Sequence, residues 1–150
     1  MEATTLLIQD HETVKKLFAQ YDAAGDEAYK TKKAIFERIK SELAIHMDIE
    51  ESIFYPTVKA QPSDELKDEI READEEHHVA KLLIAEISRM APEDEQYDAK
   101  VTVLKENIEH HVREEENELF PSAKKKLGKE LLEQLGEEME ERKDVLRGAA

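Results

Sequence analysis

The chain has 150 residues, 39% of them charged, with only four glycines and four prolines. This length suits a single hydrophobic core, and a sequence rich in Glu, Lys, Leu and Ala with few helix breakers is typical of an all-α domain. The net charge of −15 argues against nucleic acids and anionic membranes as partners, because their phosphates would be repelled. Since cysteine is absent, the sequence excludes disulfides, thiolate metal sites and cysteine nucleophiles.

The sequence shows no targeting or membrane signal. Its first residues, MEATTLLIQDHE, lack the basic start and apolar run of a signal peptide. No apolar run approaches the ~20 residues that a membrane-spanning helix needs. We therefore expect a cytoplasmic protein without a membrane partner.

Apolar residues recur at spacings of three and four, which is the period of one helix face. Gly25, Pro62, Pro92 and Gly128 interrupt this pattern. The sequence therefore predicts five helices, over about residues 4–21, 28–58, 64–90, 93–126 and from 129 onward. The last is expected to bury a face made of Leu132, Leu135, Met139 and Leu146.

Each of the first four helices carries one histidine on its apolar stripe: His11, His46, His77 and His111. In antiparallel helices, two residues share a level when their midpoint falls at the connecting turn. The midpoints of consecutive pairs fall near residues 28, 61 and 94, close to the predicted turns. We therefore predict an up-down-up-down four-helix bundle over residues 1–127, with the histidines at one level. Residues 128–150 are assigned to an additional C-terminal helix that packs on the bundle.

The second and fourth helices contain a repeat. The segment HMDIEESIFYP, which begins at His46, returns as HVREEENELFP, which begins at His111. In both, a glutamate follows the histidine by four residues (Glu50 and Glu115), and a proline follows it by ten. The chain therefore reads as a duplicated unit, in which each copy offers two histidines and one glutamate.

These six residues can form a metal site. Residues four apart share a helix face, so each glutamate and its histidine can bind one centre. Four histidines and two bridging carboxylates suffice for two ions, which also supply the positive charge that two buried carboxylates require. Imidazole and carboxylate together favour redox-active iron, with zinc as the weaker alternative. The predicted metal ligands are His11, His46, Glu50, His77, His111 and Glu115.

The same periodicity sorts the neighbours of these residues. It places His77 and His111 on inward stripes, and His78 and His110 on outer faces beside acidic residues. Three further acids are predicted to be solvated: Glu51, Glu114 and Glu116. Two repeated blocks are predicted to serve core and helix-end packing: Phe54-Tyr55-Pro56 and Leu119-Phe120-Pro121. Two tyrosines are kept as secondary candidates for a position near the site: Tyr21 and Tyr55.

This pattern resembles the hemerythrin-like, or HHE cation-binding, family over about residues 4–126. The resemblance implies a non-haem di-iron centre bridged by Glu50, Glu115 and an oxo or hydroxo group, with the four histidines as terminal ligands. Oxygen-carrying members have a fifth histidine four residues after the one that matches His77, where this sequence has Lys81. They also have an aspartate five residues after the last histidine, where Glu116 stands; here Glu115 lies at four.

A site with four histidines leaves more coordination positions open, which favours a reactive or sensing centre over a reversible oxygen carrier. We therefore expect a protein that senses or reacts with O2, peroxide or nitric oxide. Three alternatives stay open: an enzyme that consumes peroxide or nitric oxide, a reversible oxygen-binding protein, and an iron store or sensor without catalysis. The expected partner is a small diatomic molecule or peroxide, and the electron donor is not indicated.

Overall fold

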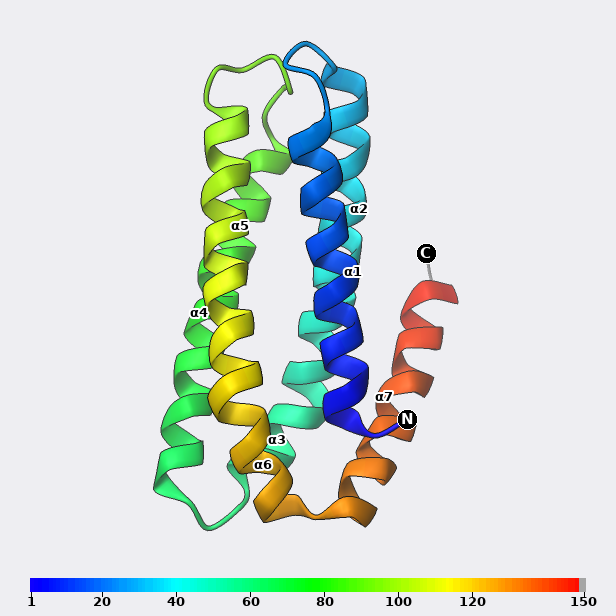
Figure 1. Ribbon diagram of the computed structural model, residues 1–150, viewed down its shortest axis with the longest axis vertical. Coiled ribbons are helices and arrows are strands. Elements are labelled where there is room, and N and C mark those ends of the chain that lie inside the picture. The colour runs from blue at the N-terminus through cyan, green and yellow to red at the C-terminus, as the bar shows by residue number, and fades with distance from the viewer. Residues whose placement is uncertain (149–150) are drawn as a thin grey trace.

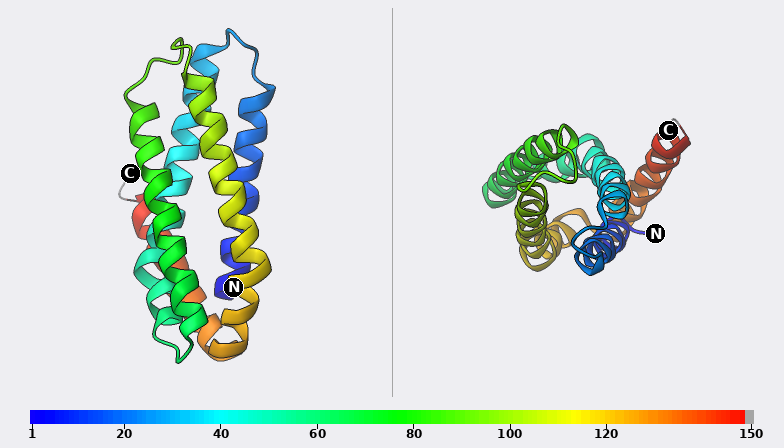
Figure 2. Two further views of the ribbon diagram at one scale, coloured as in Figure 1. Left: turned by 90° about the vertical axis from the view of Figure 1, so that its left-hand side faces the viewer. Right: turned by 90° about the horizontal axis from the view of Figure 1, so that it is seen from above.

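The computed structural model describes residues 1–148, and these form helices without any strand. The helices form four long segments and one further helix, α7. The four segments run up and down around a common axis, and α7 lies outside them (Figures 1 and 2). The predicted all-α bundle with a C-terminal helix is therefore confirmed. No helix in this part of the chain is long and apolar enough to cross a membrane. The elements are α1 (Ala3–Ala23), α2 (Tyr29–Ile49), η1 (Glu50–Phe54), α3 (Tyr55–Lys59), α4 (Asp64–Ser88), α5 (Tyr97–Glu114), η2 (Glu115–Leu119), α6 (Phe120–Leu127) and α7 (Lys129–Gly148).

Two apolar cores fill the bundle, one at each end. One contains Leu7, Ile70 and the buried face of α7, and the other contains Val14 and Leu104. The six predicted site residues lie between them; His11, for example, follows Leu7 and precedes Val14. The bundle therefore holds a buried polar layer between two apolar blocks, and those blocks supply the hydrophobic stabilisation that such a layer lacks.

The second and fourth long segments each contain one widened, π-helical turn, at η1 and η2. In both, a proline is the second residue of the helix that follows: Pro56 and Pro121 lack an amide proton, and their rings crowd the carbonyl four residues earlier. The turn widens in response, and the backbone N–H of Tyr55 bonds to the Glu50 carbonyl, five residues back. Because both π turns begin at a predicted glutamate ligand, they set the direction in which the following side chains point.

The fourth long segment begins later than predicted. Its first helical residue is Tyr97 rather than residue 93, because the preceding residues form turns. The Asp94 carboxylate accepts a hydrogen bond from the backbone N–H of Gln96, and the Asp94 carbonyl accepts one from Tyr97. An aspartate that caps its own turn in this way competes with helix formation.

Helix α7 packs along α1 and α2 (Figure 1). It buries Leu132, Leu135 and Met139 in the core that also contains Leu7, whereas Leu146 is only half-buried. The backbone at the start of the chain passes so close to Gly136 that a Cβ there would lie 1.9 Å from the Met1 carbonyl oxygen. Beyond the apolar face, three ion pairs join α7 to the bundle: Arg142–Asp48, Lys143–Asp10 and Arg147–Glu42.

Candidate metal centre

The structure brings all six predicted ligands together in the polar layer between the two cores. None is more than 5% exposed. They form two groups whose potential ligand atoms lie within 4.8 Å of one another: His11, His46 and Glu115, and Glu50, His77 and His111. The first group joins α1, α2 and η2, and the second joins η1, α4 and α5, so every long segment contributes.

Each glutamate reaches both groups. Glu50 Oε1 lies 3.1 Å from His46 Nε2 in one group and 3.1 Å from His77 Nε2 in the other. The related Glu115 Oε1 lies 3.1 Å from His11 Nε2 and 3.3 Å from His111 Nε2. Both carboxylates therefore lie between the two histidine pairs, which is where a bridging carboxylate has to be.

A ring of four outer carboxylates orients the histidines from behind. In each case the Nδ1 atom contacts an acid on a different long segment, at 2.6 to 3.0 Å. The pairs are His46 with Asp10, His77 with Glu51, His111 with Glu76 and His11 with Glu116. With Nδ1 donating to a carboxylate, the Nε2 lone pair of every histidine points to the centre of the bundle.

The prediction that Glu51 and Glu116 are simply solvated is wrong, because both contact histidines of the site. Glu114 is half-buried and contacts the exposed His110 instead. The repeat contains a sequence pattern from which these outer carboxylates could have been predicted. An acid directly precedes the first histidine of each copy, and a second glutamate directly follows each predicted glutamate ligand.

The donor set fits two transition-metal ions. His77 Nε2 and His111 Nε2 lie 3.2 Å apart, a separation at which two facing lone pairs need a proton or a cation between them. His46 Nε2 and Glu50 Oε2 are buried and make no hydrogen bond within the described chain, although His46 Nε2 is close to the other Glu50 oxygen. Imidazole nitrogens and carboxylate oxygens suit iron as well as zinc.

The electrostatics of the layer favour added positive charge. Burial lowers the pKa of His46, but the Glu50 carboxylate and a hydrogen bond to Asp10 outweigh it and raise this pKa to about 10. Hydrogen bonding to Glu50 likewise overcomes burial and raises the pKa of His77. Burial raises the pKa of Glu50, but the neighbouring His46 outweighs it and holds that pKa well below its usual value. Protons and metal ions therefore compete for the same nitrogens.

An aromatic side chain lies against one histidine of each group. The Tyr55 ring stacks on His77 with 5.3 Å between centroids, and the Phe120 ring stacks on His11 with 5.9 Å. The Tyr55 hydroxyl also donates a 2.7 Å hydrogen bond to Glu115 Oε2. Burial raises the pKa of Tyr55 well above its ordinary value, so the phenol keeps its proton. The structure thus places Tyr55 in the site.

The other secondary candidates lie outside the polar layer. Tyr21 belongs to the second core, and its hydroxyl donates to Asp98. His78 and His110 are exposed, as the periodicity predicts. Lys81 does not enter the site either, because its Nζ lies 2.7 Å from Glu51 Oε1.

A small cavity of about 20 Å³ touches all four histidines. Its other walls are apolar, and its volume is close to that of one water-sized molecule. His11, Val14, Ile108 and Val112 line this cavity and also a groove of about 760 Å³ between α1 and α5. This groove is therefore the side on which the site lies nearest to the surface.

Known proteins resemble the chain in sequence and in fold. The family model of the hemerythrin HHE cation binding domain matches residues 2–123. A crystal structure of a hemerythrin HHE cation binding domain-containing protein from Mycobacterium kansasii superimposes with a TM-score of 0.86 at 27% identity, over 99% of this chain and 89% of that one. A DNA nickase of Nostoc sp. is 25% identical over 147 residues, which are 98% of this chain but only 40% of that protein.

Proposed function

The chain belongs to the hemerythrin HHE cation binding domain family, and from that premise we propose that its buried histidine and glutamate set holds two iron ions. The four outer carboxylates carry this proposal, because they turn every Nε2 lone pair inward. Two histidines would serve each ion, and both glutamates would bridge. The proposed ligands are His11, His46, Glu50, His77, His111 and Glu115.

We further propose that the centre senses or reacts with O2, peroxide or nitric oxide. Iron, when bound, supplies Lewis acidity and one-electron redox chemistry toward such molecules. The cavity supports this size class, since its volume of about 20 Å³ holds one small molecule and no larger substrate. Its apolar walls at Val14, Ile108 and Val112 keep bulk water away from the histidines.

Tyr55 gives this centre a proton at a defined position. Its hydroxyl hydrogen lies between Oη and Glu115 Oε2, and Oη is 3.3 Å from both His77 Nε2 and His111 Nε2. The raised pKa keeps that proton on the phenol at neutral pH. Tyr55 does not line the cavity itself, but it contacts two of the histidines that do. An oxidant bound between those histidines would meet this proton, which favours a reactive centre over simple storage.

The test compares each buried histidine with the exposed histidine beside it. Metal content and visible absorption are measured for the wild type, His77→Ala, His78→Ala, His110→Ala and His111→Ala, all purified without an affinity tag and loaded anaerobically with iron. We expect about two irons per chain in the wild type and in the two exposed-site variants, and a loss in the two buried-site variants. Two irons retained in both buried-site variants would reject the ligand assignment. Zinc as the metal of the purified wild type would reject iron.

A non-catalytic iron sensor is the second candidate, and α7 is the feature that favours it. Lys143 of α7 contacts Asp10, which in turn accepts a hydrogen bond from His46. Metal loading at His46 could then stabilise the docked helix. Limited proteolysis within residues 129–148 checks this: cleavage at equal rates in loaded and metal-free protein contradicts a sensor that works through α7.

The similarity to a DNA nickase does not extend this proposal to nucleic acids. The chain spans well under half of that relative's length. Its net charge of −15 repels phosphate backbones. We therefore propose a small-molecule partner and no nucleic acid.

A further inference from the structure

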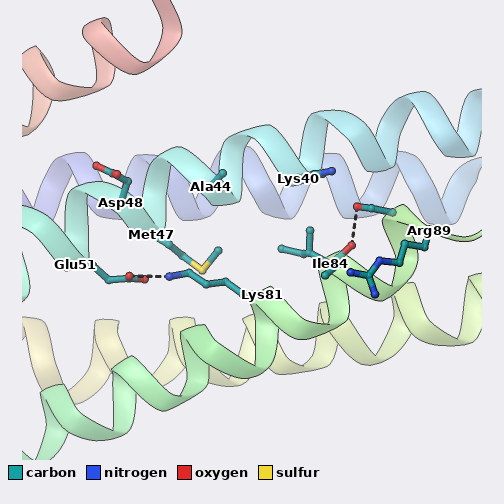
Figure 3. Close-up of a pocket in the computed structure, with 10 residues that line it drawn as sticks. Lys40, Ala44, Met47, Asp48, Glu51, Lys81, Ile84 and Arg89 are labelled. Atoms are coloured by element: carbon teal, nitrogen blue, oxygen red, sulfur yellow. Dashed lines mark hydrogen bonds and ion pairs between the residues drawn. The ribbon is translucent and has the colours of Figure 1, made fainter. Parts of the chain in front are cut away.

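A second groove lies between α2 and α4, on the face of the bundle where Glu51 of the outer ring meets Lys81. It has a volume of about 500 Å³, within the range that accommodates a drug-sized ligand. Figure 3 shows Met47 and Ile84 between its two ends, with a Lys81–Glu51 pair at one end and Lys40 and Arg89 toward the other. The groove is therefore apolar in the middle and charged at both ends.

The charge of this groove is opposite to that of the protein as a whole. Three basic and two acidic side chains line it, in a chain with 22 basic and 37 acidic residues. Both acids are already neutralised: Glu51 pairs with Lys81 at 2.7 Å, and Asp48 pairs with Arg142 at 2.9 Å. The positive charge that remains belongs to Lys40 and Arg89.

Lys40 and Arg89 have no acidic partner of their own. Neither enters an ion pair with any residue among 1–148. Glu86, one turn before Arg89 on α4, pairs instead with Lys100 at 2.8 Å. Two cations without partners at one end of an apolar groove are complementary to an acid group attached to an apolar body.

The groove between α1 and α5 does not share this property. It is larger, at about 760 Å³, but four acidic and three basic side chains line it. Its Lys105 is already bound to Asp22 at 2.6 Å. A ligand that binds through apolar contacts alone would therefore prefer the larger α1–α5 groove. Of these two grooves, the one between α2 and α4 has the unpaired positive charge that an anion requires.

We propose that the α2–α4 groove is a binding site for an organic anion whose acid group lies between Lys40 and Arg89 and whose apolar body covers Ile84 and Met47. Such an occupant would lie close to the metal centre. Met47 forms part of the cavity beside the four histidines, and Glu51 at the far end accepts a hydrogen bond from His77. The charged residues that would bind the acid group, Lys40 and Arg89, are not among the proposed metal ligands, so the proposal is independent of which metal the centre holds.

The probe for this proposal is 8-anilinonaphthalene-1-sulfonate, an aromatic sulfonate whose fluorescence rises in apolar surroundings. It is titrated into the full-length protein as purified. We expect one molecule per chain to bind. The double variant Lys40→Glu, Arg89→Glu should weaken binding by about tenfold or more, because two charge-assisted contacts are lost. The matched control Lys33→Glu, Arg38→Glu carries the same charge change on exposed positions of α2 outside the groove, and should change affinity less than about threefold.

Two further measurements separate this groove from other apolar surface. Ala44→Trp fills the groove from an exposed position and keeps every charge, so it should also weaken binding about tenfold. The uncharged analogue N-phenyl-1-naphthylamine should bind at least about tenfold more weakly than the sulfonate to the wild type. Circular dichroism confirms that each variant keeps its helical content.

The proposal is overturned if the Lys40/Arg89 double variant binds the sulfonate as the wild type does, since the probe then occupies another surface such as the α1–α5 groove. It is equally overturned if the uncharged analogue binds as tightly, because the groove would then be apolar without preference for an anion. An equal loss in the Lys33/Arg38 control would mean that overall charge, and no built site, governs binding.

Discussion

The two halves of the metal centre have the same ligands but different surroundings. Tyr55 and Phe120 occupy equivalent positions in the repeat, and each ring stacks on one histidine, Tyr55 on His77 and Phe120 on His11. Tyr55 carries a hydroxyl, whereas Phe120 does not. Only the Tyr55 half therefore has an internal proton donor. The repeat accounts for the shared arrangement of histidines and glutamates, and the Tyr55 hydroxyl makes the two halves chemically unequal.

The outer carboxylates differ in a similar way. Each copy has a lysine four residues after its first histidine, Lys15 in one and Lys81 in the other. Lys81 pairs with Glu51, whereas Lys15 forms no ion pair with the equivalent Glu116 among the described residues. Since an outer carboxylate tunes the histidine it holds, positions that are equivalent in sequence are expected to differ in effect.

The largest loss of metal is expected on removal of a glutamate that contacts both halves. Glu50→Ala removes the carboxylate that lies 3.1 Å from a histidine of each half. We expect iron loading to fall in both halves together, because each half loses one of its two bridging carboxylates and keeps only Glu115. Iron content after anaerobic loading measures this, with Glu86→Ala as the control acid, which pairs with Lys100 away from the site. A variant that retains one tightly bound iron would show that the halves load independently.

Removing the Tyr55 hydroxyl makes the two halves chemically alike. Tyr55→Phe should leave iron content unchanged but slow the reaction with the wild type's preferred oxidant by about 100-fold, the range of a lost general acid. Stopped-flow absorption measures the rate, and the buried but distant Tyr97→Phe is the control. Equal rates in Tyr55→Phe and the wild type would mean that the hydroxyl has no role in the reaction.

The outer ring should matter in both halves, with a smaller effect on metal affinity. Glu51→Gln and Glu116→Gln each weaken the hold on one Nδ1 atom. We expect about 10–100-fold weaker iron binding in each, as is typical when the partner of a ligand histidine is lost. Competition with a chelator gives the affinities. If both variants bind iron like the wild type, the outer ring does not orient the ligands.

The smallest effect distinguishes the two equivalent lysines. Lys81→Met removes a partly exposed ion pair with Glu51, and such pairs contribute about 0.2–1 kcal/mol. Metal affinity should therefore fall by no more than about fivefold, while Lys15→Met should leave it unchanged. The same chelator competition resolves this difference, and an equal effect of both substitutions would contradict the asymmetry.

Helical periodicity by itself was sufficient for the fold class and for the burial of the six proposed ligands. A residue's position on a helix stripe depends only on its neighbours three and four places away, and that is local information. The repeat around His46 and His111 then indicated that both histidines face one centre. The choice of His77 over His78 followed from the same rule, and the structure buries the first and exposes the second.

Only the tertiary structure decided what surrounds these residues. Each outer carboxylate lies on a different long segment from its histidine, so its role depends on which helices are neighbours and at what level. Tyr55 would lie about 140° around a regular helix from Glu50, but the π turn before Pro56 brings it back toward the site. Periodicity treats each helix as unbroken and as separate from its neighbours. The outer carboxylates depend on neighbouring helices and Tyr55 depends on a break in helix geometry, so periodicity could predict neither.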